Sequence, residues 1–415
     1  MGLEGADDDS ERRFSAYIDG LASVIGHADR VGPLKDYCTG LAMQLPGGRK
    51  SVEPMAAATA PTHACAQHQS LLHFVGESPW SDEKVLAKVR EMVLPDMQRH
   101  GPIEAWIIDD TAFPKHGKHS VGVARQYCGQ LGKQDNCQAA VTLSLANHHA
   151  SLPVAYRLYL PKEWASDKKR RRKAGVPDDI KFKTKPKIAA DQLRWACAAG
   201  LPRGVVLMDS GYGADAGLRT SITTLGLTYV AGIRANTLVR ASGNSQQPAS
   251  VEKLALDLPK RDWSTIEWRE GTNGTLASRF ARVRVRVAGG GKKKTASRSE
   301  EWLLAEWPKD EKKPTKYWLS TLPEDIEFSR FVNTAKLRWR IERDYLELKQ
   351  EVGLGHYEGR GWRGFHHHAT LCIATYGFLV SERETFSPSG SRSRNFFPQS
   401  AIPQGCRPRG AAAQA

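Results

Sequence analysis

The sequence has no long apolar run and no closely spaced pair of cysteines, although it is 415 residues long and contains seven Cys. No stretch approaches the roughly 20 consecutive apolar residues that a membrane helix needs. The acidic N-terminus, residues 1–11, is unlike a signal peptide. In an unexported chain without a Cys-x2-Cys motif, we expect reduced thiols and neither a zinc site nor a disulfide framework. The sequence therefore predicts a cytoplasmic protein that has no membrane partner.

Acidic residues are outnumbered, since 60 Lys and Arg face 45 Asp and Glu and give a formal net charge of +15. This balance favours a nucleic-acid partner, although a basic protein can also be merely soluble. The densest cluster consists of Lys168, Lys169, Arg170, Arg171, Arg172 and Lys173. We expect these residues to lie in a loop between two core strands and to contact DNA. The alternative is a solvated, partly disordered loop.

Two apolar segments have the composition of buried strands and end in acidic residues. Residues 105–111 end with Asp109, Asp110 and a Thr, and residues 205–208 are followed by Asp209. Side chains at strand ends reach into clefts while a rigid sheet holds their backbone. A turn-capping role is the alternative for Asp209.

A predicted helix over residues 337–349 places Arg338, Glu342 and Lys349 on one face, because steps of four and seven return nearly to the same azimuth. A carboxylate between two cations suits a metal ligand beside a phosphate-binding site. The alternative is a surface helix whose charges form ion pairs with one another. The three consecutive histidines at residues 366–368 point in different directions on a helix, so we expect no shared metal there.

These segments together resemble the DDE transposases of bacterial insertion sequences. The helical segment is similar to the signature Tyr-x2-Arg-x3-Glu-x6-Lys of the insertion-sequence-4 superfamily, and residues 117–127 and 359–368 resemble its insertion-sequence-701 group. The resemblance runs from about Arg13 to Val380. The Tyr of the signature falls on Ala335, which leaves open whether a hairpin intermediate forms.

The resemblance implies a catalytic, metal-binding triad of Asp110, Asp209 and Glu342. Asp110 is preferred to Asp109 because the catalytic Asp of the superfamily directly precedes the Thr. Hard cations take carboxylate oxygens, so we expect two Mg²⁺ ions, which Mn²⁺ can replace. The expected DNA-binding residues outside the basic cluster are Arg338, Lys349, Tyr345, Arg49 and Lys50.

The implied reaction is cut-and-paste transposition, in which the enzyme cleaves transposon ends and transfers the strands into target DNA. Its partner would be double-stranded DNA, as terminal inverted repeats and target, and a homodimer would assemble on paired ends near the nucleoid. Two alternatives stay open. One is a two-metal endonuclease without strand transfer, and the other is an inactive or domesticated DNA-binding regulator.

The predicted fold is an α/β protein with a ribonuclease H-like mixed-sheet core, an N-terminal helical domain and a β-rich insertion. In that fold the first and fourth core strands lie side by side, which would bring the acidic residues together. The interval of 133 positions between Asp209 and Glu342 is too long for a simple connection. The predicted ranges are 1–98 for the helical DNA-binding domain, 99–222 and 321–382 for the core, 223–320 for the insertion, and 383–415 for a disordered tail.

Overall fold

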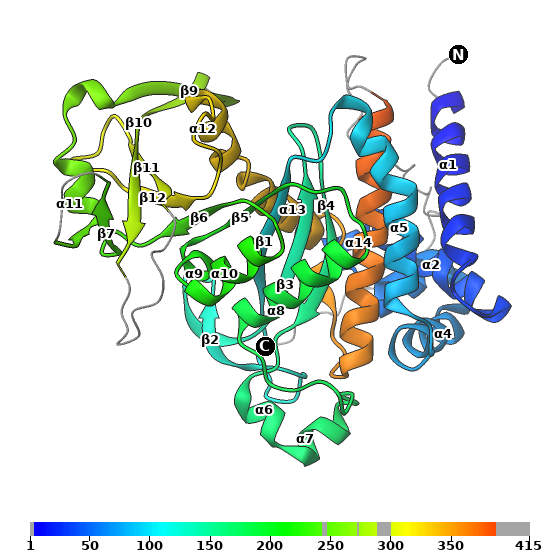
Figure 1. Ribbon diagram of the computed structural model, residues 1–415. Helices are drawn as coiled ribbons and strands as arrows, with labels where there is room; N and C mark the ends of the chain where they lie inside the picture. The colour runs from blue at the N-terminus through cyan, green and yellow to red at the C-terminus, as the bar shows by residue number, and fades with distance from the viewer. Residues whose placement is uncertain (1–3, 243–246, 272–273, 289–299, 387–415) are drawn as a thin grey trace, which may run out of the picture.

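The structure, a computed structural model, describes residues 4–242, 247–271, 274–288 and 300–386 (Figure 1). The predicted tail therefore lies almost entirely outside the described residues. Within the described ranges, no helix has both the length and the apolar character to cross a membrane. The architecture is a mixed sheet with helices on both faces and a helical body at one side, which confirms the predicted α/β fold.

The helical body combines the N-terminal helices with the last helix of the described chain. The N-terminal helices are α1 (Glu4–Ala22), α2 (Val31–Ala42), α3 (Val52–Thr59), α4 (Ala64–Gly76) and α5 (Asp82–Met97). Helix α14 (Trp362–Thr385) packs against α5, α2 and α4, and its other side covers strand β4 (Ser151–Leu158) (Figure 1). Although α14 follows the catalytic core in sequence, it completes the core of the N-terminal helices.

One continuous sheet of 12 strands runs through the rest of the molecule. Its strand order is β2-β3-β1-β5-β6-β12-β11-β10-β7-β8, with β4 paired to β3 and β9 paired to β10. The strands before the insertion are β1 (Ala105–Pro114), β2 (Ala124–Cys128), β3 (Lys133–Ala146), β5 (Val205–Met208) and β6 (Tyr229–Ile233). Strand β1 pairs antiparallel to β3 and parallel to β5, so the two strands that carry the acidic residues are neighbours, as predicted.

The inserted segment is rich in strands. It begins after β6, later than the predicted residue 223, and it extends the core sheet because β12 pairs with β6. Its elements are β7 (Leu238–Ala241), β8 (Ala249–Ser250), α11 (Val251–Leu256), β9 (Ser264–Gly271), β10 (Gly274–Val287), β11 (Glu301–Trp307) and β12 (Lys316–Ser320). Strand β10 ends with a segment in which Arg and Val alternate, residues 282–287. The insertion therefore shares a hydrogen-bonded framework with the candidate site.

Helices cover the two faces of the core sheet. One face carries α8 (Lys185–Ala198), α9 (Ser210–Gly213) and α10 (Ala216–Thr224) (Figure 1). The other face carries α12 (Phe328–Lys336) and α13 (Trp339–Gln350). Two short helices, α6 (Lys162–Ser166) and α7 (Lys168–Lys173), project beyond the sheet.

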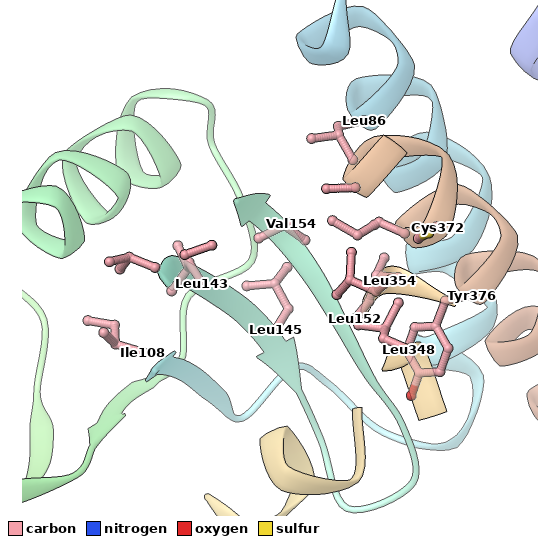
Figure 2. Close-up of a cluster of buried hydrophobic side chains, with 14 of the residues drawn as sticks. Leu86, Ile108, Leu143, Leu145, Leu152, Val154, Leu348, Leu354, Cys372 and Tyr376 are labelled. Atoms are coloured by element: carbon pink, nitrogen blue, oxygen red, sulfur yellow. The ribbon is translucent and has the colours of Figure 1, made fainter. Parts of the chain in front are cut away.

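A buried apolar cluster joins the sheet to the helical body. Figure 2 shows Leu143 and Leu145 of β3, Leu152 of β4, and Cys372 and Tyr376 of α14 in this layer. Burial of each large aliphatic side chain of this kind contributes about 1.5–3 kcal/mol. This packing fixes the position of α14. It also fixes the neighbouring α13, which is the helix that carries Glu342.

Two of the three consecutive histidines of α14, His366 and His368, form hydrogen bonds with different parts of the structure. The His366 Nδ1–H donates to the Trp362 carbonyl, at 2.9 Å, and His366 Nε2 accepts from the Leu158 N–H. The His368 Nε2–H donates to the Gly353 carbonyl, at 3.1 Å, while Nδ1 accepts from the Tyr37 hydroxyl. Burial lowers the pKa of each of these two imidazoles to about 4. The two rings therefore have separate hydrogen-bond partners.

We expect Gly213→Ala to destabilise the protein by about 2–3 kcal/mol, because a Cβ at this position would overlap the carbonyl oxygen of Gly232 on β6. Urea unfolding measures the change. Gly129→Ala is the matched control, since a Cβ there meets no atom within 4 Å. Equal stability of the two variants would contradict the close packing of α9 on β6.

The neutral histidines make stability depend on pH. Their folded pKa lies below the value of about 6.5 in the unfolded chain, so their contribution is complete above that pH and falls by up to about 1.4 kcal/mol per pH unit and per histidine as the pH drops towards 4. Denaturation between about pH 6.5 and 4.5 should therefore show a shallower slope for His368→Gln than for wild type. The exposed His119→Gln is the control. Parallel slopes for His368→Gln and wild type would show that His368 is protonated in the folded state.

Candidate active site

Strand β1 presents Asp109 and Asp110 on opposite faces of the sheet, because successive side chains of a strand alternate. The odd-numbered Ala105 and Ile107 pack with Leu337 and Ile341 next to α13. The even-numbered Trp106 and Ile108 belong to the cluster that includes residues of α8 and α10. Asp109 therefore faces α13, and Asp110 faces α8.

Asp209 shares the face of Asp109. The parallel register pairs Ile107 with Leu207 and Ile108 with Met208, so the next step brings Asp109 beside Asp209, at a strand spacing of about 4.8 Å. Asp209 also caps α9, because its Oδ1 accepts from the backbone N–H groups of Gly211, at 2.9 Å, and Tyr212, at 3.1 Å. Asp209 therefore caps a helix, which was the alternative considered from the sequence, and it also lies beside Asp109 of the neighbouring strand.

Arg338 lies between the carboxylates of β1 and α13. Its Nη1 donates to Asp109 Oδ2 at 2.7 Å, and its Nη2 donates to Glu342 Oε1 at 3.1 Å. Although burial lowers the pKa of the guanidinium, Asp109, Asp209 and Glu342 raise it above its ordinary value. Three acids from two strands and one helix therefore act on one cation, and the Glu342 side chain is 68% exposed beside them.

The ionisation of Asp109 reflects opposing influences. Burial and the nearby Asp209 and Asp110 carboxylates raise its pKa, the Arg338 guanidinium lowers it, and the net result is a pKa of about 6. At neutral pH the carboxylate is thus mostly ionised while it remains shielded from water. This is the state in which its oxygens can bind a cation.

Asp110 has a different environment from the one expected for a member of the triad. Its Oδ2 pairs with Lys185 Nζ at 2.7 Å, and its Oδ1 accepts from the Tyr212 hydroxyl at 3.0 Å. Tyr212 connects the two acidic positions, because its backbone N–H binds Asp209 and its hydroxyl binds Asp110. The pairing of Lys185 with Asp110 has no signal in the sequence, because the two residues lie 75 positions apart.

The two other residues of α13 that were predicted to contact DNA, Lys349 and Tyr345, form hydrogen bonds within the protein. Lys349 Nζ donates to the Ala112 carbonyl at 2.8 Å, and burial lowers the pKa of the ammonium. The Tyr345 hydroxyl is hydrogen-bonded to the Thr142 hydroxyl on β3. Both side chains attach α13 to the sheet, whereas the sequence analysis placed them on the DNA-facing side.

Lys50, expected at the DNA, is instead a buried anchor. Its side chain is 5% exposed, and its ammonium donates to the carbonyls of Leu41 and Glu351. Burial lowers the pKa of Lys50 to about 8. Its neighbour Arg49 is exposed and pairs with Glu358. Of the two cations predicted in this segment, only Arg49 lies at the surface.

The basic cluster at residues 168–173 forms helix α7 where a loop was predicted. The Asp167 carboxylate caps it by accepting from the Arg170 N–H at 2.9 Å. Arg171 is 9% exposed and donates to the carbonyls of Ile180, at 2.7 Å, and Pro177, at 2.8 Å. The guanidinium of Arg170 lies over the Trp164 ring. The exposed cations of this helix are Lys168, Lys169, Arg172 and Lys173.

The donors around Arg338 fit a divalent cation by their chemistry, since carboxylate oxygens are the ligands that hard ions prefer. The guanidinium shows that positive charge is stabilised between Asp109 and Glu342. Among the residues that the structure describes, no three His, Cys, Asp or Glu side chains already converge as a metal site. In the described structure, Arg338 contacts both Asp109 and Glu342.

Comparisons with known proteins identify the family of the chain. A family model described as a DDE superfamily endonuclease matches residues 20–275, and one described as a transposase DDE domain matches residues 184–378. The probable transposase for insertion sequence element IS701 of Microchaete diplosiphon is 35% identical over 169 residues, which are 40% of this chain and 41% of that relative. The resemblance noted in the sequence is thereby confirmed. Because the first model spans more than half of the sequence, the chain belongs to the DDE superfamily of endonucleases, and its similarity within that superfamily is to transposases of the IS701 group.

Proposed function

We propose that this protein is a transposase that cuts the ends of its insertion sequence and joins them to target DNA. The observation that carries the proposal is the common orientation of Asp109, Asp209 and Glu342 around Arg338. The family relationship supplies the reaction class, while the matched relative is covered over 41% of its length.

Asp109, Asp209 and Glu342 are the proposed metal ligands, and DDE endonucleases as a superfamily depend on divalent metal. Asp109 replaces the Asp110 expected from sequence, because Asp109 shares a face with the other two acids. When bound, two Mg²⁺ or Mn²⁺ ions would activate the attacking oxygen and stabilise the leaving oxygen at the phosphodiester. Asp110 is the proposed positioning residue, since it holds Tyr212 and Lys185.

Arg338 has two proposed tasks. Its positive charge opposes the effect of burial on Asp109 and so keeps that carboxylate ionised. Its planar guanidinium also has the geometry to grip two oxygens of a phosphate that flanks the scissile bond. Lys349 stabilises this site because its hydrogen bond to the Ala112 carbonyl attaches α13 to β1.

The proposed partner is double-stranded DNA, both as terminal inverted repeats and as target, bound by a homodimer that pairs the two ends. The exposed cations of α7 and the net charge of +15 suit a polyanion. Such a protein would act in the cytoplasm at the nucleoid.

We expect Asp109→Asn, Asp209→Asn and Glu342→Gln each to lower Mg²⁺-dependent cleavage by a factor of about 10²–10³, because each removes a carboxylate charge that would hold the metal ion at the reacting phosphate. Asp110→Asn should cost less, since Asp110 does not face the phosphate. A plasmid that carries the element with its flanks serves as substrate, and gel-shift binding is the control for folding. If Asp110→Asn abolished cleavage and Asp109→Asn retained it, the first acid would be Asp110. Strand-transfer products from wild type separate a transposase from a simple endonuclease.

Neutralising the four exposed cations of α7 should weaken DNA binding and reduce the slope of log affinity against log salt by up to about 0.9 per lost phosphate contact. The variant changes Lys168, Lys169, Arg172 and Lys173 to Gln. Arg171→Gln is the informative contrast, because it should lower thermal stability through the loss of its carbonyl contacts. A slope identical to that of wild type would make α7 a solvated helix without a DNA contact.

A further inference from the structure

A second basic site lies where the N-terminal segment meets the core. A cavity of about 580 Å³ is lined by three segments that are remote in sequence. These are Gly47–Arg49, the residues that follow β1, and residues 355–358 beyond α13. Its cationic and imidazole side chains are Arg49, Lys115, His116 and His356, and Glu358 is the one acid among the lining residues.

The cations of this cavity are held close together. The carbonyls of Leu41 and Glu351 bind the buried ammonium of Lys50, which ties the N-terminal segment to the turn after α13. Lys115 Nζ donates to the Tyr357 carbonyl at 2.7 Å. Burial lowers the pKa of Lys115, and the positive charge of Arg49 lowers it further. Like charges therefore face one another across the cavity, a situation that an anion would relieve.

His356 adds a donor that does not depend on protonation. Its Nδ1 accepts from the Lys50 backbone N–H at 3.0 Å, so the proton of the neutral ring resides on Nε2. The loop on the other side is also fixed, because the Asn136 side chain donates to the carbonyls of Lys115 and Gly117. The site thus combines charge with preset donors, as phosphate-binding sites do.

The cavity also has a defined place relative to the candidate active site. Strand β1 carries Asp109, and Lys115 follows six residues later, which corresponds to about 20 Å of extended chain. Helix α13 carries Glu342 and runs along β1 in the same direction, since Arg338 contacts Asp109 and Lys349 contacts Ala112; His356 follows the helix. At about 3.4 Å of duplex per nucleotide, this distance corresponds to about six base pairs.

We propose that this junction cavity binds a phosphodiester group of the DNA backbone about six base pairs from the scissile bond. The position of that phosphate rests on the proposed function, whereas the binding itself does not. The site would set the reach of the duplex into the active site, because its segments are tied to α13 and β1: Lys50, next to Arg49, binds the Glu351 carbonyl after α13, and Lys115, just after β1, binds the Tyr357 carbonyl.

The test measures the affinity of the full chain for a short duplex of arbitrary sequence, without divalent metal, over a range of salt concentrations. Arg49→Ala and Lys115→Gln should each reduce the log–log salt slope, by up to about 0.9, since each removes one of the cations that would neutralise the bound phosphate group. The Gln retains a donor for the Tyr357 carbonyl. Arg203→Ala is the matched control, because this exposed arginine precedes β5, at the opposite end of that strand from Asp209.

Glu358→Gln gives a change in the opposite direction that misfolding cannot imitate. Loss of the one lining acid frees Arg49, so DNA affinity should rise by about two- to fivefold. Unchanged slopes in Arg49→Ala and Lys115→Gln, or an equal loss in Arg203→Ala, would overturn the proposal. Stabilisation of wild type by inorganic phosphate, with a DNA slope that Arg49→Ala leaves unaltered, would assign the cavity to a free anion instead.

The cleavage assay separates this site from the proposed function. If wild type binds DNA with an Arg49-dependent slope but never cleaves in Mg²⁺, the transposase proposal fails and the phosphate site remains. If wild type cleaves and the slopes do not respond to the cavity variants, the phosphate site fails and the transposase proposal remains.

Discussion

Parallel pairing of β1 with β5 is the constraint on which the candidate active site depends. The register of Ile108 with Met208 sets two acidic residues, 100 positions apart in the chain, at the same level and on the same face. Their mutual repulsion is a cost that the fold meets with Arg338, whose guanidinium contacts Asp109 and Glu342. The sheet thus supplies the geometry, and the helix supplies the charge that allows the acids to be so close.

The cations elsewhere in the molecule have different roles according to whether they are buried or exposed. Lys50 and Arg171 are buried, yet each donates to backbone carbonyls and so avoids the cost of an unpaired charge in the interior. Lys349 attaches a helix to a strand in the same manner. These side chains function as structural connectors, whereas neighbouring cations such as Arg49 and Arg172 are exposed at the surface.

Apolar composition predicted the two acid-bearing strands, and helical periodicity predicted the face of the helix that carries Arg338 and Glu342. The adjacency of the two strands was implied by the family resemblance, through the ribonuclease H-like fold. The sequence did not identify which of Asp109 and Asp110 faces the helix. Strand β1 is apolar on both faces, since Ala105, Trp106, Ile107 and Ile108 are all buried, so its composition contains no alternation that reveals the orientation.

Buried cations were also beyond sequence reasoning, for a different reason. Their carbonyl partners come from distant backbone, as with Lys50 and Glu351, and no side-chain type marks a backbone acceptor in a sequence. The continuity of the insertion with the core sheet was likewise hidden, because the pairing of β12 with β6 depends on the path of the chain through some 80 intervening residues.

The packing of α14 against α2, α4 and α5 has a consequence for the order in which the chain matures. The first helices leave the ribosome long before Trp362 is synthesised, so their apolar surfaces stay without their final neighbour throughout most of translation. A nascent polypeptide therefore acquires its complete helical body only when the last helix emerges, at the point where the helix of Glu342 has already been made.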